Sequence, residues 1–143
     1  MNTYRRILAA LDLTADSRAV AARADELARE WNGSLQLLHV VEFVPIEPMS
    51  DSLVPVIQID DQMIARARTQ IEALAQDLGV PASACHVEAG SAKSEILRYA
   101  REQHADLIVL GSRERHGLSV LVNLTEDTVL HGAPCDVLAV RVR

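Results

Sequence analysis

The chain has 143 residues, of which 49% are hydrophobic, and its 20 acidic and 14 basic side chains give a formal net charge of -6. This length and composition suit one compact domain over residues 1–143. A sequence pI near 5.3 offers no overall positive field to a nucleic-acid backbone or an anionic membrane, so we predict neither partner. The apolar stretches are far shorter than the roughly 18 residues of a membrane span. The first residues lead directly into a strand-like segment, and we expect a cytoplasmic protein.

Cysteines and aromatic residues exclude two further classes. Cys85 and Cys135 have no close Cys or His partner at metal-ligand spacing, so the sequence predicts no zinc module and no disulfide framework. We interpret both as small core residues. Aromatic residues make up 3% of the chain, too few for the stacking platforms of single-stranded nucleic-acid binders.

Short apolar runs alternate with longer segments of helical periodicity along the whole chain. Several of these runs are almost continuously apolar, which is typical of parallel strands buried on both faces. The predicted strands are Ile7–Leu11, Leu35–Val41, Cys85–Ala89, Leu107–Leu110 and Val137–Val142.

Helical periodicity predicts two helices before the third strand. The first carries apolar positions on one face from Val20 to Trp31 and stops at Asn32 and Gly33. The second steps by three and four residues from Ile64 to Leu78, and Gly79 followed by Pro81 ends it.

Two more helices are predicted in the second half of the chain. Ser91 or Ser94 can cap a third helix that contains the apolar residues Ile96, Leu97 and Ala100. A fourth is predicted near Leu118–Leu130 and stops before Pro134.

The predicted order of elements is βαβαβαβαβ. Right-handed crossovers then give an α/β fold with three layers, in which helices cover both faces of a doubly wound, five-stranded parallel sheet. The element order does not by itself fix the strand order, and we adopt the common order 3-2-1-4-5. Ligands of such sheets bind outside the carboxyl ends of the strands at the switch point, which here are marked by Asp12 and Gly111.

The segment 42–59 is too long for an ordinary connection between a strand and a helix. It contains three prolines among apolar residues: Pro45, Pro48 and Pro55. Two interpretations remain open, a lid or contact surface and a packed connector that covers the edge of the sheet.

Several stretches resemble the universal stress proteins of the UspA family: ILAALDL, LQLLHVVE, GSAKSEILRYAREQHADLIVLGS and HGAPCDVLAV. The resemblance covers essentially the whole chain. It implies a Rossmann-like fold of the adenine-nucleotide-hydrolase type, a cytoplasmic location, frequent dimerisation and a role in survival under stress. It does not by itself imply ATP binding, because only some members bind ATP.

ATP-binding members carry a loop of the form G-x-x-G, followed after a spacer of eight to nine residues by G-[ST]. In this sequence Gly111 matches the first glycine, but Glu114 stands at the second. The later pair falls on Asn123 and Leu124, with Thr125 just after it. Because glycine lets phosphate oxygens reach backbone amides, and Glu114 adds a negative charge there, the altered loop predicts lost or weakened ATP binding.

The resemblance also implies positions for the adenosine half of a nucleotide. Asp12 corresponds to a carboxylate near the nucleotide, and Val40 to a residue whose backbone meets adenine. The candidate nucleotide pocket is therefore Asp12, Val40, Gly111 and Thr125, and its ligand would be ATP or AMP. Alternatively, Asp12 caps the helix that follows it.

Other constellations predict no catalytic centre. The five histidines are dispersed, and no Ser, His and acid set has the local context of a nucleophile. Arg113, Arg115 and His116 form a small cationic loop that could receive an acidic or phosphorylated partner, or could simply be solvated.

Two functional hypotheses follow. The first is a dimeric, non-enzymatic interaction module of the stress response, which needs no cofactor or metal and could bind an unknown protein partner. The second is an ATP-binding switch with possible slow hydrolysis. We expect the homodimer to form through strand 136–142, because a long apolar edge invites pairing with a second copy.

Overall fold

The computed structural model describes residues 3–42, 61–113, 129 and 131–142. Its strands and helices alternate as far as the fourth strand, with a short 3-10 turn at Ala82–Ala84. The elements are β1 (Arg6–Ala10), α1 (Ser17–Glu30), β2 (Ser34–Glu42), α2 (Asp61–Leu78), β3 (Cys85–Gly90), α3 (Ala92–Glu102), β4 (Leu107–Arg113) and β5 (Asp136–Val142).

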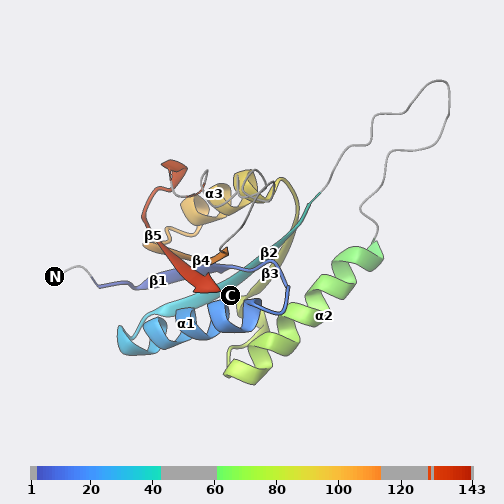
Figure 1. The fold of residues 1–143 in the computed structure, drawn as a ribbon, viewed down its shortest axis with the longest axis horizontal. Coiled ribbons are helices and arrows are strands. Elements are labelled where there is room, and N and C mark those ends of the chain that lie inside the picture. Colours follow the sequence, from blue (N-terminus) through green and yellow to red (C-terminus); the bar gives the residue numbers. More distant parts are fainter. Residues whose placement is uncertain (1–2, 43–60, 114–128, 130, 143) are drawn as a thin grey trace.

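The strands form one parallel sheet in the order β3-β2-β1-β4-β5. Helices α1 and α2 cover one face of this sheet, and α3 covers the other (Figure 1). The α/β class, the five parallel strands and the order 3-2-1-4-5 are thereby confirmed.

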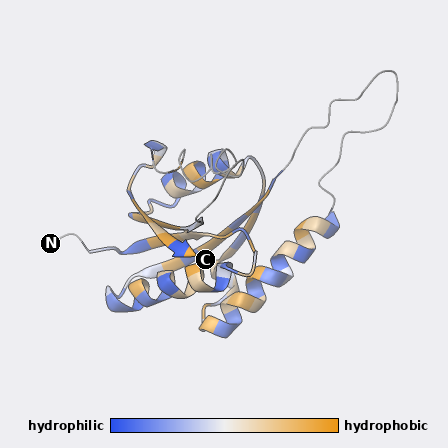
Figure 2. Ribbon diagram, viewed as in Figure 1, coloured by the Kyte–Doolittle hydropathy of each residue, from blue (hydrophilic) through white to orange (hydrophobic). Residues whose placement is uncertain are grey.

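The two faces of the sheet hold separate aliphatic cores, because successive side chains of a strand point to opposite faces. On the α1 and α2 face, Ile7, Leu37 and Ile71 are at most 1% exposed. On the α3 face, Leu8, Leu38 and Ile108 are equally buried. The strands are accordingly hydrophobic along most of their length, while the helices carry hydrophilic residues outward (Figure 2). Burying each such side chain stabilises the fold by roughly 1.5–3 kcal/mol.

Two arginines of α1 attach it to α2. Arg18 forms an ion pair with Asp77. The Nη2 atom of Arg29 donates to the carbonyl of Leu78, at 3.0 Å. That carbonyl belongs to the last residue of α2, and Gly79 follows with φ +75°, a left-handed conformation that suits glycine. The predicted stop of the second helix is confirmed.

Several predicted boundaries differ from the structure, among them the ends of β1 and α1. Leu11 lies just beyond β1, although its backbone N–H still donates to the carbonyl of Leu38, at 2.8 Å. Trp31 is the C-cap of α1 rather than its last helical residue. Of the two serines predicted to cap α3, Ser91 occupies the N-cap position, although its side chain makes no capping hydrogen bond, and Ser94 lies inside the helix.

Two predicted features fall mainly outside the described residues. The segment 42–59 is described only at Glu42, the last residue of β2. Of the fourth predicted helix and its end, the structure describes Val129, His131 and Gly132, all helical. Within the described ranges, no helix is long and apolar enough to cross a membrane.

Candidate functional site

The carboxyl ends of β1 and β4 form the switch point of this sheet, where the chain order reverses. The last registered pair of β1 with β2 is Ala10 with Leu38, and its last pair with β4 is Ala9 with Val109. Both neighbours continue beyond these pairs, β2 to Glu42 and β4 to Arg113. The turn that follows β1 therefore lies between the ends of two longer strands, which is where such sheets bind ligands.

Asp12 begins this turn, and its side chain organises the start of α1. Its Oδ1 atom accepts the backbone N–H of Thr14 at 3.0 Å and the Thr14 hydroxyl at 2.7 Å. It also accepts the hydroxyl of Ser17, at 2.9 Å. Ser17 is the first residue of α1 and only 3% exposed. The N-cap position belongs to Asp16, so Asp12 fixes the turn and the first helical side chain without being the N-cap residue.

The residues next to Asp12 add two constraints that sequence reasoning missed. Leu13 has φ +58°, a left-handed conformation that is uncommon for a residue with a side chain. The Nδ1 atom of His39 donates to the carbonyl of Leu11, at 2.7 Å, and so selects one tautomer of the imidazole. His39 lies on the part of β2 that extends past β1, so strand and turn are held together at the switch point.

Val40 lies one residue further along β2. Its side chain is 7% exposed and belongs to the core on the α3 face. Its registered neighbour in β3 is Glu88, while the register with β1 has already ended at Leu38. Val40 and Asp12 are thus on adjacent elements at the same end of the sheet, as the resemblance implies.

Gly111 lies in β4 opposite Val140 of β5, and its immediate surroundings are apolar. A Cβ atom added to Gly111 would lie 3.1 Å from Cγ2 of Val20 and 3.8 Å from Cγ2 of Val142. The first of these contacts is tighter than ordinary van der Waals contact. The absence of a side chain at Gly111 therefore lets α1 approach the sheet.

The remaining predicted site residues lie outside the described ranges. They are Glu114, Asn123, Leu124 and Thr125, together with Arg115 and His116 of the cationic loop. Arg113 is described as the last residue of β4. The structure therefore brings Asp12, Val40 and Gly111 to one end of the sheet. The residues that depart from the ATP-binding loop pattern are known from the sequence alone.

A second polar group lies near the edge strand β3. The Nε2 atom of His86 donates to the amide oxygen of Gln36, and the His86 ring lies 5.0 Å from the ring of Tyr99, measured between centroids. Burial, followed by the nearby Arg68 guanidinium, lowers the pKa of His86, and Glu88 opposes this shift. These surroundings favour the neutral form of His86, as expected of a packed polar residue.

The two cysteines are free thiols, and their surroundings make them poor nucleophiles. Burial raises the pKa of Cys85. Burial also raises the pKa of Cys135 to about 11, assisted by the charges of Asp106 and Asp136. Within the described residues, no group of three or more His, Cys, Asp or Glu side chains could hold a metal ion.

An open depression of about 390 Å³ lies at the opposite end of the sheet. Arg6, Gln36 and Glu102 are among the residues that line it. These residues lie at the amino ends of β1 and β2 and at the last turn of α3. Doubly wound sheets bind ligands at the carboxyl ends of their strands, so the switch point, and not this depression, is the candidate site.

The fold and the position of the site define the class of protein, a doubly wound α/β domain with its site at the switch point. Comparison with known proteins is more specific. The model of the universal stress protein family matches residues 3–141. The chain belongs to this family, and membership supports a role in the stress response.

Two relatives illustrate the similarity in sequence. Universal stress protein A homolog 2 of Coxiella burnetii is 35% identical over 144 residues, covering 100% of this chain and 99% of the relative. Universal stress protein A homolog 1 of the same organism is 34% identical over 138 residues, covering 96% of each chain.

Solved structures agree with the fold. The universal stress protein UspA from Lactobacillus plantarum superposes with a TM-score of 0.76 at 25% identity, covering 99% of this chain and 100% of its own. A universal stress protein solved in complex with cAMP superposes with a TM-score of 0.71, covering 98% of each chain, at 15% identity. At that identity the second likeness shows the fold alone.

Proposed function

We propose that this protein acts in the stress response as a dimeric, non-enzymatic interaction module in the cytoplasm, with lost or weakened ATP binding. The observation that carries the proposal is the sequence of the phosphate loop. Glu114 replaces a glycine, and Asn123 and Leu124 replace the later Gly-Ser or Gly-Thr pair. Two like charges about 5 Å apart repel by roughly 3 kcal/mol at an effective dielectric near 20, so one carboxylate beside a phosphate weakens affinity about a hundredfold.

The described half of the site supports the same proposal. The Oδ1 atom of Asp12 already accepts hydrogen bonds from Thr14 and Ser17. Gly111 is explained by the packing of Val20 without any ligand. Both residues thus have structural roles that would persist after nucleotide binding was lost. One structural neighbour was solved in complex with cAMP. A small nucleotide is therefore the ligand with which the proposed loss of binding should be tested.

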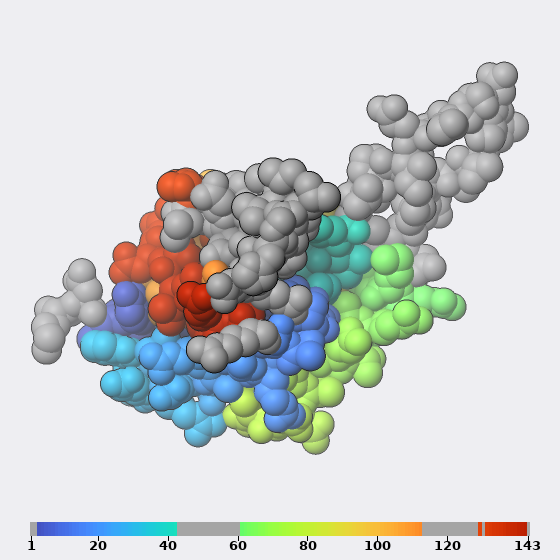
Figure 3. Space-filling model, viewed as in Figure 1, coloured from blue at the N-terminus to red at the C-terminus, as the bar shows by residue number. Residues whose placement is uncertain are grey.

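The proposed dimer uses β5, which is an edge strand of the sheet. Its apolar residues Val137, Leu138 and Val140 are only partly buried. The red C-terminal residues lie at the surface beside α1 (Figure 3). A two-fold axis perpendicular to the sheet at Ala139 would place Leu138 opposite the partner's Val140 and would pair the open backbone groups of both strands. Light scattering at micromolar concentration should give the dimer mass, and a monomer mass would contradict this interface.

A gain-of-binding experiment tests the loop. In the triple variant Glu114→Gly, Asn123→Gly and Leu124→Ser, the glycines and the hydroxyl of the ATP-binding pattern return. We expect ATP to bind this variant at least tenfold more tightly than the wild type, since a charge, two side-chain obstructions and a missing donor are corrected together. A folded triple variant with unchanged affinity would contradict the loop argument.

A further inference from the structure

The two edge strands of the sheet differ in character. Strand β5 offers a run of apolar residues with Asp136 and Arg141 near its ends. Strand β3 is the edge at the other side, and its central residues His86, Val87 and Glu88 are half-buried. An exposed edge can pair with another chain, and natural sheets use charged residues to prevent such pairing. A protein that forms a dimer through β5 therefore needs some feature that prevents a further copy from pairing with β3.

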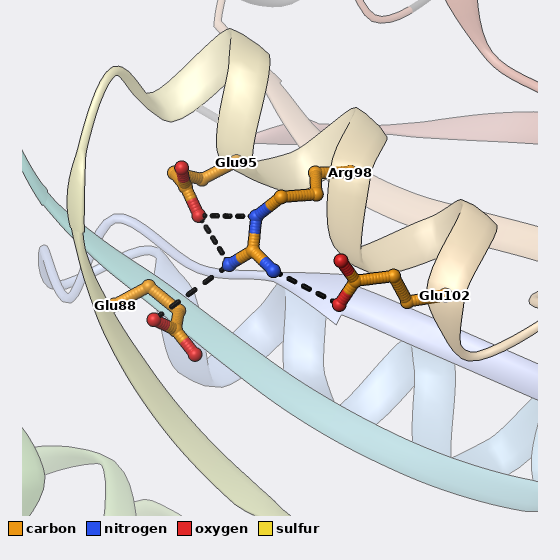
Figure 4. Close-up of polar contacts among 4 residues, drawn as sticks. All are labelled: Glu88, Glu95, Arg98 and Glu102. Carbon is orange, nitrogen blue, oxygen red and sulfur yellow. Dashed lines mark hydrogen bonds and ion pairs between the residues drawn. The ribbon is translucent and has the colours of Figure 1, made fainter.

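A charged group spans α3 and β3, and we name its four residues Glu88, Glu95, Arg98 and Glu102 the Arg98 cluster. The Arg98 guanidinium donates to Glu95 through Nε at 2.9 Å and to Glu102 through Nη1 at 2.9 Å. Its Nη2 atom lies 3.7 Å from the carboxylate of Glu88. Figure 4 shows the guanidinium between two carboxylates of α3 and the carboxylate that reaches it from β3.

The Arg98 cluster is negative overall, because three carboxylates surround one guanidinium and leave a formal charge of -2. The hydrogen bonds that Arg98 donates to Glu95 and then to Glu102 raise the pKa of Arg98, so its positive charge is always present. The four side chains remain 21–54% exposed. Exposed ion pairs add little to stability, so the main physical consequence of the cluster is a negative field beside β3.

We propose that the Arg98 cluster prevents β3 of one copy from pairing with β3 of another, so that assembly stops at the dimer formed through β5. This inference rests on the proposed β5 dimer. Antiparallel pairing about a two-fold axis would bring the clusters of both copies to the same junction, where like charges disfavour association. Without the cluster, each copy would pair with one neighbour through β5 and with another through β3, and this repeated pairing would build an open chain of copies.

A neutralised variant tests the proposal directly. Glu88→Gln, Glu95→Gln and Glu102→Gln together keep the shapes of the side chains and remove the negative charges. Sedimentation velocity in low salt should show dimers for the wild type and, for this variant, tetramers and longer species that grow with protein concentration. A folded neutralised variant with the mass distribution of the wild type at every concentration would overturn the proposal.

Two controls separate the cluster from general effects of charge. The variant Asp25→Asn, Glu26→Gln and Glu30→Gln removes the same charge from α1, and it should remain a dimer. Arg98→Gln increases the negative charge beside β3 and should also remain a dimer. Larger assemblies of either control would contradict the assignment to the Arg98 cluster.

Two further measurements locate the new interface. In the assembled neutralised variant, the backbone amides of residues 85–90 should gain protection from hydrogen exchange, and protection confined to other segments would overturn the proposal. A charge-reversed variant, Glu88→Lys, Glu95→Lys and Glu102→Lys, should remain a dimer alone but form larger species when mixed with the wild type. A monomeric wild type would contradict the proposed β5 dimer. In that case, dimerisation of the neutralised variant through residues 85–90 would still support the role of the Arg98 cluster.

Discussion

Val20 of α1 packs against the bare backbone of Gly111 in β4. A Cβ atom added to Gly111 would lie 3.1 Å from Cγ2 of Val20, which is 4% exposed and has little freedom to move. The glycine thus sets how closely the helix approaches the sheet. This relationship gives Gly111 a role in packing that is independent of any ligand.

We predict that Gly111→Ala destabilises the protein by about 1–3 kcal/mol, because the added methyl group overpacks the interface between α1 and the sheet. Removing the methyl groups of Val20 should relieve that crowding. The double variant with Val20→Ala should therefore be more stable than the sum of the two single effects by at least ~0.5 kcal/mol. Urea unfolding of the four proteins measures this coupling, and simple additivity would contradict the packing role.

Asp12 should matter for stability as well as for any ligand. Asp12→Ala removes the acceptor of the buried Ser17 hydroxyl, and we expect a cost of about 1–3 kcal/mol. Asp12→Asn keeps an acceptor oxygen and should recover part of that loss. In a Ser17→Ala background the Asp12→Ala change should cost less, because no buried hydroxyl is left unsatisfied. Full stability of Asp12→Ala in thermal unfolding would show that the carboxylate has no structural role.

His86 should contribute a measurable pH dependence. Its pKa is lowered in the folded protein, mainly by burial, so between that value and 6.5 the unfolded chain binds more protons at this residue than the folded chain does. The contribution of His86 to stability is therefore fully present above pH 6.5 and is lost as the pH falls through the lowered pKa.

The variant His86→Gln provides the comparison, because carboxylates also titrate as the pH falls. The wild type should lose more stability than this variant between neutral and acidic pH, as measured by unfolding at a series of pH values. An NMR titration of the His86 ring should give a pKa below 6.5. A value above that would reverse the predicted sign.

Cys135 should react slowly with alkylating reagents in the folded protein. Its pKa is raised from 9.0 to about 11, so the thiolate fraction at pH 8 falls by about a hundredfold. In a Cys85→Ser variant, iodoacetamide should modify Cys135 much faster in urea than in native buffer. Equal rates in the two conditions would mean that the thiol is not shielded as the structure indicates.

The sequence pattern predicts the sheet well because its three central strands, β1, β2 and β4, are apolar on both faces. Strands β1 to β5 follow from short aliphatic runs, and the end of α2 follows from Gly79. The strand order needed an assumption, since alternating elements do not say which strands are neighbours. The apolar run predicts that β4 ends at Leu110, whereas the strand continues to Arg113, because Gly111 and the polar residues after it interrupt the apolar run.

The candidate site was only partly predictable. Asp12 and Gly111 follow from their positions directly after the apolar runs of strands one and four. The structure places Asp12 two residues beyond β1, but Gly111 lies inside β4, which continues to Arg113. The partnership of Asp12 with Ser17 was missed, although Asp, Thr and Ser near the start of a helix are common turn and capping residues. The contact of Gly111 with Val20 could not be predicted, because it depends on the distance between a helix and the sheet.

Calorimetric titration of natively purified wild-type protein with ATP and magnesium tests the central claim most directly. Extraction of the small molecules that copurify with the protein completes the measurement. We predict no copurifying ATP and no saturable binding with a dissociation constant below about 10 μM, which corresponds to roughly −7 kcal/mol. Copurifying ATP, or a dissociation constant below that limit, would contradict the account and would favour an ATP-binding switch.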